Sequence, residues 1–159
     1  LVTALLGATI ISSFGGAIEK LVALAALSPM VASIGGNAGT QTMAVAVRAL
    51  ATNQLTRANT GRILLREFRV ALLNGVTVAT LIGVATTLVF ANPLLGAVIA
   101  TAVMVNIVTA GLAGVIVPVL FDRFDQDPAV ASSVFVTMIT DSMGFFAFLG
   151  LAVASGLVG

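Results

Sequence analysis

Asp141 is an isolated carboxylate in a long apolar part of the chain, and it is the first candidate for chemistry. Residues 128–140, which precede it, carry no charged side chain. If this stretch crosses a membrane, the charge costs about 2.5–3.5 kcal/mol on insertion scales, and an intramembrane carboxylate usually has a function. We therefore expect Asp141 to be a cation ligand or a proton carrier facing a water-filled path. A protonated carboxyl hydrogen-bonded to a neighbouring helix is the structural alternative.

Two stripes of polar residues accompany this carboxylate. Ser133, Thr137 and Asp141 recur at intervals of four, which places them on one helix face, and Gly144 extends that face with bare backbone. The second stripe, with Arg48 near its inner end, consists of Ser33, Asn37, Thr40 and Gln41. Hydroxyls can bond to carbonyls of their own helix, but a primary amide in hydrocarbon needs several partners. We expect the two stripes to face each other across water.

The oxygen atoms of these residues are hard ligands, which suit Mg²⁺ or Ca²⁺. A single Asp within the predicted spans supplies few ligands, so a symmetric dimer that brings two carboxylates to one divalent ion is expected. Four glycines permit close backbone approach and support that homodimer: Gly35, Gly39, Gly144 and Gly150. Asn74 and Asn106 are predicted within other spans, where hydrogen bonds between helices are an equally good explanation.

The composition predicts the elements that hold these residues. Of 159 residues, 59% are hydrophobic and 8% charged, and the mean hydropathy of +1.18 excludes a water-soluble globule. A helix needs about 20 apolar residues to cross a bilayer. We predict an all-α polytopic membrane bundle with five transmembrane helices per protomer, at about residues 1–18, 21–51, 70–90, 94–121 and 129–158. Pro29 is expected to bend or break the second span.

Basic residues predict the orientation of these spans. The polar connection 52–69, together with Arg48, holds five of the seven Lys and Arg residues, and such residues are retained on the cytoplasmic side. The 52–69 and 122–128 loops are therefore predicted to be cytoplasmic, with the 91–93 turn and the C-terminus outside. We expect a multi-pass protein of the cell (inner) membrane, surrounded by the lipid bilayer. Because Leu1 already lies in an apolar run, we also expect the membrane part of a longer protein.

Several functional classes are excluded by residue types that are missing. The sequence has no Cys and no His, which excludes a disulfide framework, the usual zinc and haem sites and His-based acid–base catalysis. A net charge of +1 provides no basic surface for nucleic acid. No combination of nucleophile, base and cofactor motif is present, so we do not expect an enzyme.

Three segments of the sequence resemble the MgtE family of magnesium channels, which is related to solute carrier family 41. Residues 29–42, PMVASIGGNAGTQT, are similar to the second-helix signature of that family, and Arg48 follows them. Asp127-Pro128-Ala129, with the polar stripe after it, is similar to the entry into its last helix. Gly114-Val-Ile-Val-Pro118 fits the end of its fourth helix. The resemblance covers essentially the whole chain in order and spacing.

The resemblance implies that residues 1–159 are a transmembrane pore domain that forms a homodimer, with the cation pore along the dimer interface. Asp141 would be the selectivity carboxylate, and Asn37 with nearby backbone oxygens would hold the water shell of Mg²⁺. The implied metal-site residues are Asp141, Asn37, Gly36, Thr137 and Gly144. The family's cytoplasmic regulatory part, an N-domain and paired CBS modules, is missing from this chain.

Three functions are compatible with the sequence. The first is a Mg²⁺-selective channel that passes a largely hydrated ion passively, with other divalent cations as possible substrates. The second is a proton- or sodium-coupled secondary transporter, in which Asp141 alternates between binding partners. The third is a membrane anchor whose polar stripes only join helices. Flux in liposomes separates the three.

Overall fold

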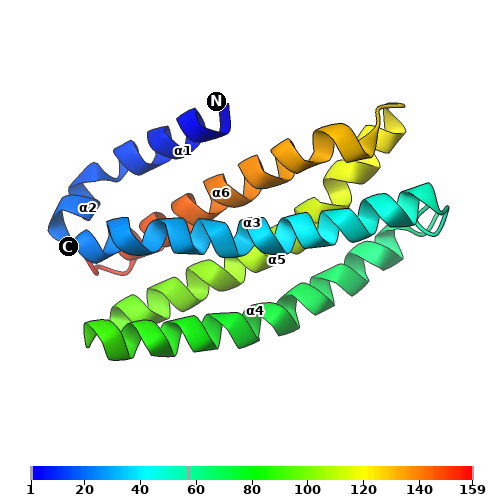
Figure 1. Ribbon diagram of the computed structural model, residues 1–159. Coiled ribbons are helices and arrows are strands. Elements are labelled where there is room, and N and C mark those ends of the chain that lie inside the picture. Colours follow the sequence, from blue (N-terminus) through cyan, green and yellow to red (C-terminus); the bar gives the residue numbers. More distant parts are fainter. Residues whose placement is uncertain (1, 57, 159) are drawn as a thin grey trace.

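The computed structural model describes residues 2–56 and 58–158, apart from the side chains of residues 19, 20 and 131. All regular elements in this part of the chain are helices: α1 (Val2–Ser13), α2 (Gly15–Lys20), α3 (Val22–Ala51), α4 (Thr60–Phe90), α5 (Pro93–Arg123) and α6 (Pro128–Ala154). The long helices run up and down beside one another (Figure 1). The connections after α3 and α5 lie at one end of the bundle, and the turn after α4 lies at the other. The predicted all-α bundle is confirmed.

Four helices are long and apolar enough to cross a membrane: Val22–Ala51, Thr60–Phe90, Pro93–Arg123 and Ser132–Ala154. The first predicted span, residues 1–18, is instead a pair of short helices, since α1 ends at Ser13 and α2 begins at Gly15. The 12 residues of α1 extend about 18 Å, less than the roughly 30 Å of a hydrocarbon core. The predicted count of five is therefore not confirmed; the described residues contain four such helices.

The polar connection 52–69 is shorter as a loop than predicted, because α4 already begins at Thr60. The helical part of the segment carries four charged residues: Arg62, Arg66, Glu67 and Arg69. Asn59 closes the remaining loop, where its side-chain oxygen accepts a hydrogen bond from the Thr56 amide at 2.8 Å and its Nδ2 donates to the Gln54 carbonyl at 2.8 Å. A helix forms its own backbone hydrogen bonds in water as well as in lipid, so α4 can extend beyond the membrane into the charged segment. The end of the charged segment therefore predicted the start of this helix too late.

Pro29 does not interrupt the helix in which it lies. Pro29 lies inside α3, which continues from Val22 to Ala51, so the helix is not broken there. Beside it, the Ser28 hydroxyl donates to the Leu24 carbonyl of the same helix at 2.6 Å. A single missing amide donor is tolerated in a helix that neighbouring helices hold in place.

Side-chain caps fix the starts of α5 and α6. Each of these helices has proline in its first turn, where a missing amide donor costs nothing. The Asn92 side chain accepts a hydrogen bond from the Leu95 amide at 3.0 Å, and the Asp127 carboxylate accepts one from the Ala129 amide at 2.8 Å. Both helix starts agree with the predicted turns. The last helix ends at Ala154, slightly before the predicted residue 158.

The central helix of the bundle is α5, which packs against α3, α4 and α6 and lies behind α3 in Figure 1. In an apolar 18-residue stretch of α5, 61% is buried inside the bundle, whereas the corresponding share in α4 is 22%. Asn106 is fully buried on α5, and its Nδ2 donates to the Val31 carbonyl of α3 at 2.9 Å. The explanation of Asn106 as a hydrogen bond between helices is therefore confirmed.

Glycines bring the helices of one protomer into close contact. A Cβ on Gly39 would lie 2.8 Å from Val136 of α6, and one on Gly114 would lie 2.9 Å from the carbonyl oxygen of Gly39. Gly35 and Gly144 are likewise buried inside the bundle. Three of the four glycines that were expected at a dimer interface therefore pack within the protomer: Gly35, Gly39 and Gly144. Because neighbouring helices of the same protomer already cover these three glycines, they give no support to a contact between two copies.

Candidate cation site

Asp141 lies on the side of α6 that faces α1. Its side chain is half-buried and lines a cavity of about 410 Å³ together with residues of α1 and α6: Thr3, Ala4, Gly7, Ala8, Ile11 and Phe145. Asp141 is the one acidic or basic residue in this lining. No Lys or Arg occurs anywhere in α6. The carboxylate is thus placed in a largely apolar groove with space beside it for water or an ion.

Gly36 of α3 brings bare backbone close to this carboxylate. A Cβ placed on Gly36 would lie 3.8 Å from Oδ1 of Asp141 and 3.8 Å from Oγ1 of Thr140. The helices that the sequence predicted to carry facing polar stripes therefore meet at Gly36 and Asp141. The Thr140 hydroxyl donates to carbonyls of its own helix, those of Val136 and Thr137, both at 3.1 Å. That hydroxyl is consequently held beside the carboxylate in a defined orientation.

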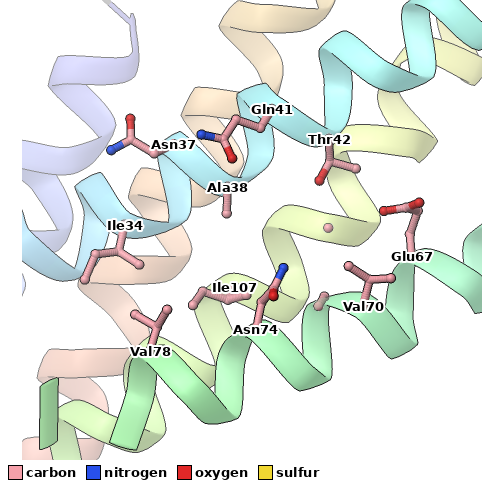
Figure 2. A pocket seen from close by; sticks show the side chains of 12 residues that line it. Ile34, Asn37, Ala38, Gln41, Thr42, Glu67, Val70, Asn74, Val78 and Ile107 are labelled. Atoms are coloured by element: carbon pink, nitrogen blue, oxygen red, sulfur yellow. The ribbon is translucent and has the colours of Figure 1, made fainter. Parts of the chain in front are cut away.

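Asn37 lies at a second cavity, of about 340 Å³, between α3 and α4. Figure 2 shows Asn37 and Gln41 on α3 and Asn74 and Glu67 on α4, with Asn74 projecting toward α3 and Glu67 lying on the side of Thr42. Asn37 and Gln41 are exposed in the single protomer. Gly36 is adjacent to Asn37 in sequence, but it approaches Asp141 and lines neither cavity. One copy of the chain therefore does not bring Asn37 into the cavity that Asp141 lines.

The other candidate residues are part of the helix framework. Thr137 is half-buried and its carbonyl receives the Thr140 hydrogen bond. Gly144 is buried, and a Cβ on it would lie 2.9 Å from the Cα of Ala32 on α3. Neither residue lines the cavity at Asp141 or the cavity at Asn37. Gly144 thus allows α6 to approach α3 closely, one helical turn beyond Asp141.

Sequence reasoning missed two polar residues near the candidate site, Glu67 and Thr140, and considered Asn74 without assigning it to a cavity. Glu67 and Asn74 line the cavity next to Asn37, and Thr140 lies beside Gly36. The available signal was the spacing of Glu67 and Asn74 by seven residues, two helical turns on one face. It was hidden because Glu67 had been assigned to a loop.

The ligand supply of one protomer is limited. The described residues contain no group of three or more His, Cys, Asp or Glu side chains able to hold a metal ion. What the two cavities offer is one carboxylate each, amide and hydroxyl oxygens, and helix backbone. Such an arrangement can attract a hydrated cation and hydrogen-bond to its water shell.

Comparison with known proteins identifies the family. The family model MgtE, described as a divalent cation transporter, matches residues 28–151. The chain is 33% identical over 150 residues to the magnesium transporter MgtE of Bacillus subtilis, covering 94% of the chain and 33% of that protein. It is 32% identical over 152 residues to the magnesium transporter MgtE of Thermus thermophilus, covering 96% of the chain and 34% of that protein.

A third relative, the magnesium transporter MgtE of Enterococcus faecalis, is 34% identical over 145 residues, covering 91% of the chain and 32% of that protein. The chain thus spans about a third of the length of the curated relatives it matches. The family-model match at residues 28–151 includes Asp141, the residues that line the α3–α4 cavity and most of each membrane-length helix. Family model and relatives agree with the resemblance seen in the sequence, and the chain belongs to the MgtE family.

Proposed function

We propose that two copies of this chain form a Mg²⁺-selective channel, with Asp141 of each copy attracting the ion. The observation that carries the proposal is the position of Asp141: a carboxylate without a basic residue on its helix, beside a cavity and beside the bare backbone of Gly36. A carboxylate at this depth needs a cation to offset its desolvation. The names of the relatives, magnesium transporters, favour Mg²⁺ as that cation.

The ion should pass largely hydrated. Mg²⁺ requires near-octahedral oxygen ligands at about 2.0–2.1 Å and gives up water reluctantly. One carboxylate per copy and neutral oxygens cannot complete that shell. The site would therefore select by charge and by hydrogen bonds to coordinated water, which is a role suited to Asn37 and to the backbone near Gly36.

The second copy is proposed because the polar face of α3 is uncovered. Asn37 and Gln41 are exposed in the protomer, and primary amides facing lipid would lack hydrogen-bond partners. A twofold axis near this face would hide the amides around water and bring two Asp141 carboxylates toward one path. Two carboxylates balance the charge of one divalent ion.

The proposed topology keeps the basic connection 52–59 and the start of α4 in the cytoplasm of the cell, because of their arginines. The connection between α5 and α6 lies at the same end of the bundle (Figure 1) and would also be cytoplasmic. The pair α1–α2 would complete a fifth crossing.

Flux in liposomes tests the mechanism. We expect the purified chain, reconstituted with a Mg²⁺-sensitive dye inside the vesicles, to admit Mg²⁺ down its gradient with no pH or Na⁺ difference, and faster at inside-negative voltage. Uptake that requires an imposed proton or sodium gradient would indicate a coupled transporter instead. Absence of Mg²⁺ uptake under every gradient would favour the anchor function. Mass photometry of the same sample should give a dimer, and a conducting monomer would contradict the interface.

A further inference from the structure

Asn106 is a fully buried polar residue near the middle of the central helix α5. Its Nδ2 donates to the Val31 carbonyl of α3 at 2.9 Å. Its Oδ1 is buried and has no hydrogen-bond partner. Buried polar atoms are normally paired, and leaving the Oδ1 of Asn106 unpaired costs free energy that an apolar side chain of the same size would not cost. The amide therefore needs an explanation beyond filling space.

The carboxamide of Asn106 fills a gap between α3 and α6 that two glycines leave open. A Cβ on Gly35 of α3 would overlap the carboxamide, and a Cβ on Gly144 of α6 would lie 2.8 Å from its Nδ2. The same Cβ on Gly144 would lie 2.9 Å from the Cα of Ala32 on α3. Three helices thus meet around one amide group.

This meeting point lies directly behind the candidate cation site. Gly35 precedes Gly36 on α3, and Gly144 follows Asp141 by one turn on α6. Gly36 and Asp141 are the two residues that approach each other on the open side of the same helix pair. A change in the spacing of α3 and α6 at Asn106 must therefore change the spacing between Gly36 and Asp141.

We propose that Asn106 is a positioning residue for the cation site: its hydrogen bond to Val31 and its contacts with Gly35 and Gly144 set the α3–α6 spacing that places Gly36 beside Asp141. The inference concerns geometry, and its link to selectivity rests on the proposed channel function. The bond to Val31 is directional, so it fixes the rotation and register of α3 on α5. Leucine at residue 106 would fill the volume without fixing either.

Disulfide formation measures the spacing without reference to transport. The natural sequence has no Cys, so the pair Gly36→Cys and Thr140→Cys is unique, and a Cβ at residue 36 would lie 3.8 Å from the Thr140 hydroxyl oxygen. Because disulfides need narrow Cβ geometry, Asn106→Leu should slow oxidation of this pair about fivefold or more. Asn106→Ala, which removes the amide with less risk of overpacking, should act in the same direction.

Ser28→Ala is the matched control. Ser28 is also buried on α3, but its hydroxyl bonds only within that helix, to Leu24. The control should oxidise the pair at the parental rate. Equal rates in the parent and in both Asn106 variants would overturn the inference, whether or not the chain transports Mg²⁺.

Selectivity is measured next in the single variants, with residues 36 and 140 unchanged. Asn106→Leu should lower the Mg²⁺ over K⁺ permeability ratio about tenfold, since small misplacements of a site have effects of this size or larger. Its thermal stability should stay close to that of Ser28→Ala, which a role in stability alone would not predict. Parental selectivity in Asn106→Leu, beside a loss in Asp141→Asn, would overturn the positioning role. Parental selectivity in Asp141→Asn would instead overturn the channel site.

Discussion

The α1–α6 cavity and the α3–α4 cavity differ in what surrounds their single carboxylate. At the α1–α6 cavity, Asp141 has small and apolar neighbours, with Thr3 as the other polar side chain in the lining. At the α3–α4 cavity, Glu67 shares the lining with Asn37, Gln41 and Asn74. The α1–α6 cavity thus offers a charge with few groups that could hydrogen-bond to the water shell of an ion. The α3–α4 cavity offers a charge together with several such groups.

Position along the bundle strengthens this difference. Glu67 lies in the charged beginning of α4, close in sequence to Arg66 and Arg69, where water and neighbouring charges weaken its field. The energy between unit charges 4 Å apart is about 1 kcal/mol in water and about 4 kcal/mol at an effective dielectric constant of 20. A carboxylate deep in the bundle therefore acts on a cation far more strongly than one near the end. Two similar side chains should have unequal roles.

The largest expected effect is the contrast between Asp141→Asn and Glu67→Gln. Each change removes one negative charge and keeps the size of the side chain. Asp141→Asn should reduce Mg²⁺ flux in liposomes about 100-fold or more and abolish selectivity over monovalent ions, because the charge acts in a medium of low dielectric constant. Glu67→Gln should change flux about threefold at most. Equal losses in both variants would remove the distinction between the cavities.

An intermediate effect is expected at the adjacent glycines, which face opposite surroundings. A Cβ at Gly35 would overlap the Asn106 carboxamide, whereas a Cβ at Gly36 meets only ordinary contacts at 3.8 Å. Gly35→Ala should destabilise the protein by about 1–3 kcal/mol through overpacking. Gly36→Ala should leave stability within about 0.5 kcal/mol but reduce Mg²⁺ flux, because a methyl group enters the space beside Asp141. Unfolding monitored by circular dichroism in detergent measures the first effect.

Asn106→Ala provides the control for that pair of variants. If the amide is the obstacle, combining it with Gly35→Ala should restore part of the stability that Gly35→Ala loses, so the two changes would be non-additive. Simple addition of the two losses would show that the methyl group collides with something else.

The smallest effect should come from the amides. Asn37→Ala removes hydrogen bonds to the water shell of an ion, each worth about 0.5–1.5 kcal/mol, so the apparent Mg²⁺ affinity in flux titrations should fall about two- to tenfold. Asn74→Ala is the partner control across the same cavity. A similar fall there would assign the α3–α4 cavity to the ion path, and an unchanged affinity would restrict that role to α3.

The sequence predicted the parts of the fold that depend on composition and caps. Apolar stretches located the four long helices, and Asn92 and Asp127 marked two helix starts that the structure has. It was less accurate where tertiary contacts decide. Of the expected bend or break at Pro29, the break does not occur in α3, and residues 1–18 do not form one helix of membrane length. Helix packing overrides a local signal in the first case, and the sequence carries no equally clear signal in the second.

For the candidate site, periodicity identified Asp141 and the polar face of α3 but could not say how that face is oriented. Helical spacing places Ser33, Asn37 and Gln41 together, yet the rotation of α3 is fixed by Gly35 and Gly39 against α5 and α6. Those contacts turn Gly36 toward Asp141 and leave Asn37 at the other cavity. Glycine contacts of this kind depend on three helices at once, so one sequence could not reveal them.

The two-residue turn between α4 and α5 has a consequence for how the chain enters a membrane. Ala91 adopts a left-handed conformation, with φ of 49°, and Asn92 caps the next helix. A Cβ on Gly83 would lie 3.0 Å from the Gly96 carbonyl oxygen, so the helices are in contact immediately beside the turn. With no charged residue in the turn or in the adjoining halves of the two helices, no charged side chain has to be carried across the membrane with them. These helices can therefore enter the bilayer together as one helical hairpin, whose α5 carries the contacts with α3 and α6.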